Sequence, residues 1–142
     1  MDVFTYGTLM SPDIMMRVSG CSPDSCIAHL HGFRRSRVKG EEYPGIRENA
    51  EAVVQGLLYL NVPEAAGERL DIFEGEMYER RQVKVQTEGG FEKSAVTYVF
   101  RPGYDDLLTE NPWEFEEFLV SGKKRFEDRY FGMNEIEEGE RG

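Results

Sequence analysis

The chain has 142 residues, of which 39% are hydrophobic and 31% charged, a composition typical of a globular protein with one core. Its formal net charge of −10 disfavours binding to nucleic acids and to anionic membrane surfaces, whose phosphates would repel it. No run approaches the roughly 18 consecutive apolar residues that a membrane span requires, and the N-terminus does not resemble a secretory signal. We therefore expect a cytoplasmic protein that binds neither nucleic acid nor membrane.

We assign residues 1–131 to a single domain. Residues 132–142 contain four glutamates and few side chains that could be buried. Such a segment cannot offset the conformational entropy that is lost on folding, so we expect a disordered acidic tail there.

A short strand and a helix are predicted at the start of the chain. Residues 3–6 have the composition of a strand and end before a glycine. Ser11 followed by Pro12 is typical of an N-cap and a first helical turn. Gly20 is the expected stop of this helix, which runs through Val18.

Two strands and a second helix follow. Alternating apolar and polar residues predict strands over 27–38 and 53–60, with a turn at 43–46, where the sequence reads Tyr-Pro-Gly-Ile. Pro63 begins the second helix, whose apolar residues recur at helical spacing and whose C-terminal stop is Gly75.

The last third of the chain predicts a hairpin and a third helix. Strands over 78–87 and 94–100 flank residues 88–90, Glu-Gly-Gly, which are typical of a turn. Asn111 is the expected N-cap of the third helix, with Pro112 in its first turn. Its expected core face recurs every three or four positions: Phe115, Phe118, Leu119, Gly122, Phe126 and Tyr130. This order of elements favours an α+β fold with a small, mainly antiparallel barrel-like sheet flanked by helices.

Two clusters of polar residues are candidates for a binding site, one for a metal ion and one for phosphate. Four potential zinc ligands lie within eleven residues: Cys21, Cys26, His29 and His31. Their spacing lacks the two separated pairs of structural zinc sites, so we expect no metal. A basic cluster follows: Arg34, Arg35, Arg37 and Lys39. Phosphate binding is one interpretation of this cluster, and a solvated strand edge or pairing with some of the 27 acidic residues is the other.

Carboxylates are the leading acid/base candidates, because nucleotide-binding, serine-hydrolase and calcium-binding motifs are missing. Four stretches occur in a recognisable order: Val3-Phe4-Thr5-Tyr6-Gly7-Thr8-Leu9, Tyr43-Pro44-Gly45-Ile46, Leu70-Asp71-Ile72-Phe73-Glu74-Gly75 and Tyr78-Glu79-Arg80-Arg81. Together they resemble the γ-glutamylcyclotransferase-like family, which includes the plant AIG2-like proteins and the γ-glutamylamine cyclotransferases. The resemblance spans about residues 2–130, and segments 37–40 and 113–117 are most similar to the AIG2-like branch.

This resemblance implies a compact β-barrel-like fold flanked by helices, a small-molecule γ-glutamyl substrate and no cofactor. It implies that Tyr6, Gly7, Thr8 and Leu9 line the pocket, where the N–H groups of residues 7–9 bind the α-carboxylate of the substrate. It also implies that Glu74 is the catalytic general acid/base of an enzyme that cyclises the γ-glutamyl group to 5-oxoproline and releases the amine.

Elementary chemistry agrees with that role, because a γ-glutamyl amide carries its own nucleophile. Once a base has removed a proton from the free α-amine, the amine can attack the γ-carbonyl carbon and close a five-membered lactam. Glu74 is expected at a helix C-terminus beside Phe73 and Tyr78, where the helix dipole and desolvation both favour the protonated carboxyl. We therefore predict a raised pKa for Glu74.

Neighbouring polar side chains receive different predictions. Tyr43 is predicted to line the pocket, and a rigid Tyr-Pro turn is equally compatible with its position. Tyr78 is predicted to line the pocket and to donate a hydrogen bond to the substrate or to Glu74, and an aromatic side chain that covers the sheet edge is the equally compatible alternative. Asp71 is interpreted as structural, with a second pocket carboxylate as the alternative, and Arg80 as a local pairing partner.

Two other functions share this sequence pattern. The chain is alternatively a non-catalytic AIG2-like module that binds a ligand or a protein, since fold membership does not determine activity. A hydrolase that uses Glu74 to activate water on another small amide is the third hypothesis. The sequence determines neither which γ-glutamyl compound reacts nor the oligomeric state.

Overall fold

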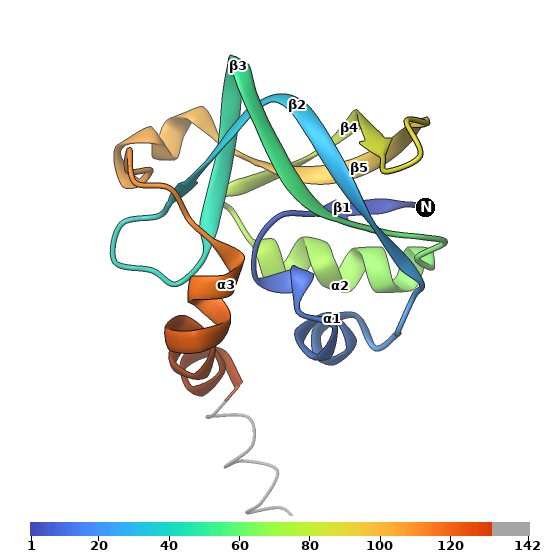
Figure 1. Ribbon diagram of the computed structural model, residues 1–142. Helices are drawn as coiled ribbons and strands as arrows, with labels where there is room; N and C mark the ends of the chain where they lie inside the picture. The colour runs from blue at the N-terminus through green and yellow to red at the C-terminus, as the bar shows by residue number, and fades with distance from the viewer. Residues whose placement is uncertain (132–142) are drawn as a thin grey trace, which may run out of the picture.

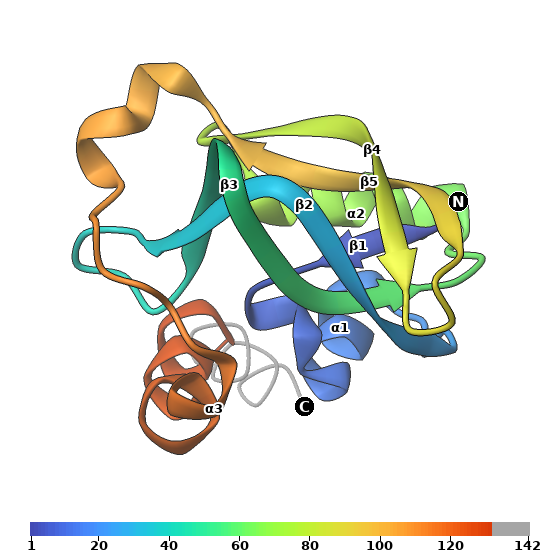
Figure 2. The ribbon, with the colours of Figure 1, turned by 45° about the horizontal axis from the view of Figure 1, so that its top comes forward.

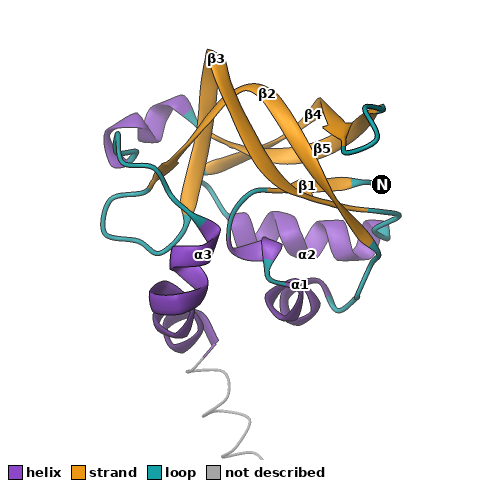
Figure 3. Cartoon of the chain, in the orientation of Figure 1, coloured by secondary structure: helices purple, strands orange, loops and turns teal. Residues whose placement is uncertain are grey.

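Five strands close into a small barrel, and the α-helices gather on one side of it (Figure 1, Figure 3). The computed structural model describes residues 1–131, so the predicted tail at 132–142 lies outside the described residues. The strands are β1 (Val3–Thr5), β2 (Ser25–Arg37), β3 (Pro44–Tyr59), β4 (Tyr78–Thr87) and β5 (Glu92–Phe100). Their order around the barrel is β1-β3-β2-β4-β5, and all neighbours are antiparallel except β1 and β5. The predicted α+β fold with a barrel-like, mainly antiparallel sheet is confirmed.

Two hairpins supply most of the barrel. The long β2–β3 hairpin wraps across it (Figure 2), with a register that runs from Ser25 opposite Tyr59 to Arg37 opposite Pro44 and shifts once on the way. The predicted β4–β5 hairpin is confirmed, and Gly90 supplies the φ of 82° that its turn requires.

The motif at residues 43–46 begins a strand, so the turn predicted there is wrong. The chain reverses just before it, at residues 38–43. Pro44 takes the first strand position, where proline is tolerated because it disturbs the hydrogen-bond ladder least. A Cβ on Gly45 would lie 2.8 Å from the Phe100 ring, so this glycine is needed for close packing and not for a turn.

Two helices, α1 (Pro12–Ser19) and α2 (Glu64–Glu74), lie within a residue of their predicted boundaries. Both end at glycines with positive φ, Gly20 at 78° and Gly75 at 76°, as the sequence predicted. Glu74 is accordingly the last residue of α2.

The third helix begins later than predicted. α3 (Phe115–Glu117) passes into a π-helical turn (Phe118–Gly122), and helical backbone continues over residues 123–131. Asn111 is not its N-cap, because the segment before the helix pairs with the end of β2, where the Arg37 N–H donates to the Asn111 carbonyl at 2.8 Å. A 3-10 segment, Pro102–Leu107, connects β5 to this region.

Buried apolar side chains form two clusters, one inside the barrel and one between the sheet and the helices. Alternation along β1 directs Phe4 into the barrel and Val3 toward the helices. The last helix contributes Phe118 and Phe126 to the outer cluster, but Leu119, which was predicted on the same face, is exposed. None of the helices within residues 1–131 is long and apolar enough to cross a membrane.

Candidate active site

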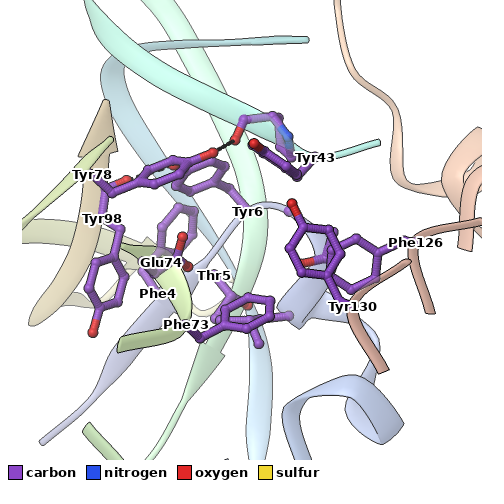
Figure 4. Close-up of a pocket in the computed structure, with 14 residues that line it drawn as sticks. Phe4, Thr5, Tyr6, Tyr43, Phe73, Glu74, Tyr78, Tyr98, Phe126 and Tyr130 are labelled. Carbon is purple, nitrogen blue, oxygen red and sulfur yellow. Dashed lines mark hydrogen bonds between the residues drawn. The ribbon is translucent and has the colours of Figure 1, made fainter. Parts of the chain in front are cut away.

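A pocket of about 60 Å³ lies at the C-terminal end of β1, between the barrel and the helices (Figure 4). One water needs roughly 10–15 Å³ of such space, so the pocket is large enough for a small polar group to enter. Aromatic side chains make up most of its lining: Phe4, Tyr6, Tyr43, Phe73, Tyr78, Tyr98, Phe126 and Tyr130. The other lining residues are Thr5, Gly7, Thr8, Leu9, Pro44 and Glu74. All the site residues predicted from the sequence are among them: Tyr6, Gly7, Thr8, Leu9, Tyr43, Glu74 and Tyr78.

Glu74 reaches the pocket from the last turn of α2, and its carboxylate lies beside Tyr6 and Tyr78 (Figure 4). Within residues 1–131, no group hydrogen-bonds to that carboxylate. Enclosure by the protein penalises the charged form and, together with the negative charge of Asp71, raises the pKa of Glu74 to about 8. The predicted direction of the pKa shift is confirmed, and desolvation is its larger cause.

Asp71 precedes Glu74 by one helical turn and does not line the pocket. Its Oδ1 accepts hydrogen bonds from Arg80 Nε at 3.0 Å and from the Tyr98 hydroxyl at 2.5 Å. Local pairing of Arg80 is therefore confirmed, and the structural interpretation of Asp71 agrees with these contacts. The two bonds tie the C-terminal end of α2 to β4 and β5, which fixes the position of Glu74.

The Tyr6–Leu9 segment forms a second wall of the pocket. The chain leaves β1 and enters a 3-10 turn, η1 (Thr8–Met10), which is closed by a hydrogen bond of 3.0 Å from the Met10 N–H to the Gly7 carbonyl. The first N–H groups of such a turn have no acceptor within it. The N–H groups of residues 7–9 therefore have no acceptor within the turn, and all three residues line the pocket.

Arg35 on β2 holds the start of this loop. Its Nη1 donates to the Tyr6 carbonyl at 2.9 Å and to the Gln55 carbonyl at 3.1 Å. The guanidinium also lies over the Trp113 ring, with 5.3 Å between Cζ and the ring centroid. Arg35 thereby links the loop to β2, β3 and the segment before α3.

The other basic residues and the metal-ligand candidates lie away from the pocket. Arg34 donates to the Glu110 carbonyl, and Arg37 pairs with Glu117 at 3.4 Å, which agrees with the pairing interpretation. In the described part of the chain, no three Cys, His, Asp or Glu side chains gather where they could hold a metal ion. Both cysteines are free thiols.

Two of the pocket tyrosines, Tyr6 and Tyr78, direct their hydroxyls to backbone carbonyls. Tyr78 donates to the Pro44 carbonyl at 2.7 Å, so its hydroxyl is not directed at the carboxylate of α2. Tyr6 donates to the Tyr98 carbonyl at 2.6 Å. Burial holds the pKa of Tyr6 and Tyr78 well above the usual value, because a buried phenolate is poorly solvated. Tyr43 packs against Tyr78, with 6.3 Å between the ring centroids, and desolvation raises the pKa of Tyr43 as well. All three tyrosines are therefore uncharged at neutral pH.

The sequence alone did not predict that Tyr98, Phe126 and Tyr130 line the pocket. Spacing assigns Phe126 and Tyr130 to the apolar face of the last helix, and the same spacing suits ordinary core packing. Tyr98 lies on a strand with no pattern that marks it. Phe73 is the exception, because its position next to Glu74 already predicted that it would enclose the carboxylate.

A family model for "Gamma-glutamyl cyclotransferase, AIG2-like" matches residues 3–115. AIG2-like protein A of Arabidopsis thaliana is 37% identical over 127 residues, which cover 88% of this chain and 76% of that protein. A solution structure of an Arabidopsis thaliana protein superposes with a TM-score of 0.70 at 32% identity, covering 96% of this chain and 91% of that one. A solved gamma-glutamyl cyclotransferase has a TM-score of 0.58 at 18% identity, covers 75% and 74% of the two chains, and supports the fold alone.

Proposed function

Because the chain belongs to the gamma-glutamyl cyclotransferase, AIG2-like family, we propose that it is an enzyme that cyclises the γ-glutamyl group of a γ-glutamyl amine or amino acid to 5-oxoproline and releases the amine. The observation that carries the proposal is the carboxylate of Glu74. It is enclosed in a pocket, lacks a hydrogen-bond partner within residues 1–131 and has a pKa of about 8. Glu74 is the general acid/base, and the reaction uses no cofactor.

The substrate supplies the nucleophile in this reaction. Glu74 removes a proton from the α-ammonium group, and the free amine attacks the γ-carbonyl carbon to form the new C–N bond of the lactam. The old amide C–N bond then breaks. Two protons pass in all from the α-nitrogen to the departing nitrogen, each carried by Glu74, so the carboxylate ends in the state in which it began.

The pKa of Glu74 suits both proton transfers. The substrate's α-ammonium group lies beside a free carboxylate, so its pKa is above the roughly 7.7–8.0 of a peptide N-terminus, whereas an ordinary glutamate has a pKa of roughly 4.3. Transfer to an ordinary glutamate would therefore be uphill by about 5 kcal/mol or more. With its pKa at about 8, Glu74 receives the proton at a much smaller cost in free energy.

The loop at residues 7–9 positions the substrate. Its backbone N–H groups hold the α-carboxylate, and no lysine or arginine within residues 1–131 lines the pocket, which agrees with the acidic character of the chain. Binding the glutamyl group in a folded conformation brings the amine close to the γ-carbonyl, so that ring closure becomes an intramolecular step.

The test is release of 5-oxoproline by the purified protein from a panel of γ-glutamyl amines, γ-glutamyl dipeptides and glutathione. Glu74→Gln is expected to lower kcat by at least about 100-fold, because the amide cannot carry a proton. Glu68→Gln, which changes an exposed carboxylate on the same helix, should leave kcat within about twofold.

The product distinguishes the competing functions. Free glutamate in place of 5-oxoproline would indicate the hydrolase that uses Glu74 to activate water. Binding of the panel members without any turnover would indicate the non-catalytic module and would overturn the enzymatic proposal.

A further inference from the structure

The mouth of the pocket is bordered by three aromatic side chains, Tyr43, Phe73 and Tyr130, which we call the aromatic rim. They are the aromatic lining residues that remain partly exposed, whereas the others are buried. The Tyr130 ring centroid lies 6.2 Å from that of Tyr43 and 6.4 Å from that of Phe73. Figure 4 shows Tyr43 and Tyr130 across the cavity from Glu74.

The rim borders the space that the leaving amine must use if the proposed function holds. Glu74 has to come within hydrogen-bond reach of the departing nitrogen in order to protonate it. The substituent on that nitrogen therefore begins beside Glu74. Buried side chains, including Phe4 and Tyr6, close the deep side of the pocket, so the substituent extends toward solvent past the aromatic rim.

The pocket offers no positive charge to this substituent. No lysine, arginine or histidine is among the described residues that line it. Arg129 lies near the rim, but its guanidinium pairs with Glu41 at 2.9 Å. The hydroxyls of Tyr43 and Tyr130 stay neutral, because desolvation raises the pKa of each.

An amino-acid leaving group fits these surroundings poorly. Its carboxylate carbon is two bonds from the departing nitrogen, which would place a second negative charge close to Glu74. Removing a carboxylate from water beside a like charge, with no cation to compensate, is strongly unfavourable. A neutral ring in the same place would instead make edge-to-face or offset contacts with the rim, which aromatic side chains favour.

We propose that the amine released by this enzyme carries an uncharged aromatic group and no carboxylate. This inference rests on the proposed function and selects among its substrates. It follows from the aromatic rim at the mouth, from the lack of a cation in the described lining and from the position of Glu74 beside the bond that breaks.

Three matched compounds test it. γ-Glutamyl-phenethylamide has the ring and no second carboxylate, γ-glutamyl-phenylalanine adds that carboxylate, and γ-glutamyl-ethylamide lacks the ring. We expect kcat/KM for 5-oxoproline release from the phenethylamide to exceed that from each of the other two by about tenfold or more. Equal or faster release from γ-glutamyl-phenylalanine or from the ethylamide would overturn the inference while leaving the cyclotransferase function standing.

A variant of the rim separates its contribution from a general loss of activity. Tyr130→Leu is expected to reduce the ratio of kcat/KM for the phenethylamide over the ethylamide by about threefold or more, because the ring loses an aromatic partner. Phe91→Leu changes an exposed aromatic residue outside the pocket and should leave that ratio unchanged. An unchanged ratio in Tyr130→Leu would count against the rim, and the absence of 5-oxoproline from the whole panel would overturn both the function and this inference.

Discussion

At the scale of single residues, the carboxylate of Glu74 has an environment that differs from that of a structural glutamate. Buried carboxylates are usually paired or hydrogen-bonded, since burial of an unpaired charge is costly. Glu74 has no such partner within residues 1–131, and the nearby charge that affects it, Asp71, is also negative. This arrangement lowers the stability of the folded state, and it gives Glu74 a pKa suited to proton transfer near neutral pH.

Asp71→Asn tests the electrostatic part of this arrangement. In the unmodified protein, kcat/KM is expected to fall as Glu74 becomes protonated below its pKa of about 8. The substitution removes the repelling charge and leaves the guanidinium of Arg80 uncompensated, so the pKa of Glu74 should decrease. The acid limb of the pH profile should therefore move to lower pH.

The measurement is the pH dependence of kcat/KM for both proteins across the neutral range. Asp24→Asn, which alters an exposed carboxylate outside the pocket, is the matched control and should keep the profile of the unmodified protein. An acid limb that stays in place in Asp71→Asn would show that desolvation alone sets the pKa of Glu74.

At the scale of elements, the ends of α1 and α2 were predicted more accurately than the start of β3. The ends of α1 and α2 depend on prolines and glycines within the same few residues, and such signals can be read locally. The start of β3 at Pro44 depends instead on its pairing with Arg37 across the hairpin. The same motif that suggests a turn in the sequence becomes a strand once that partner is present.

The loop after β1 offers a test at this scale. A Cβ on Gly7 would lie 2.8 Å from Pro44 Cδ and 3.0 Å from Cγ, so Gly7→Ala must displace the loop or the proline. Because the loop amides hold the α-carboxylate in the proposed reaction, we expect KM to rise about tenfold and kcat to change less.

The control for this loop is Gly103→Ala, where an added Cβ would meet no atom within 4 Å. Steady-state kinetics and circular dichroism of both variants are the measurements. If Gly7→Ala folds normally and keeps the KM of the unmodified protein, the loop amides do not position the substrate.

At the scale of the whole molecule, the site reduces the stability of the fold at high pH. The pKa of Glu74 is about 8 in the folded state and roughly 4.3 in the unfolded state, so the folded state binds more protons between those values. The contribution of Glu74 to the free energy of unfolding therefore decreases as pH rises through this window.

Glu74→Gln should reverse this loss, because glutamine cannot ionise. We expect the variant to exceed the unmodified protein in free energy of unfolding by roughly 1–3 kcal/mol above pH 8, and to differ little below about pH 4. Denaturant unfolding at both pH values provides the measurement. A variant that is less stable at every pH would contradict the assignment of a desolvated carboxylate.

The amino-acid sequence by itself determined the ends of α1 and α2, the β4–β5 hairpin and the position of Glu74 at the end of a helix. Each of these depends on residues that are close together in the chain. Only the tertiary structure showed that Phe126 and Tyr130 join the loop after β1 in one pocket, and that the Tyr78 hydroxyl donates to the Pro44 carbonyl. Contacts between distant segments have no local signature, because the same aromatic spacing buries a side chain in a core or turns it toward a cavity.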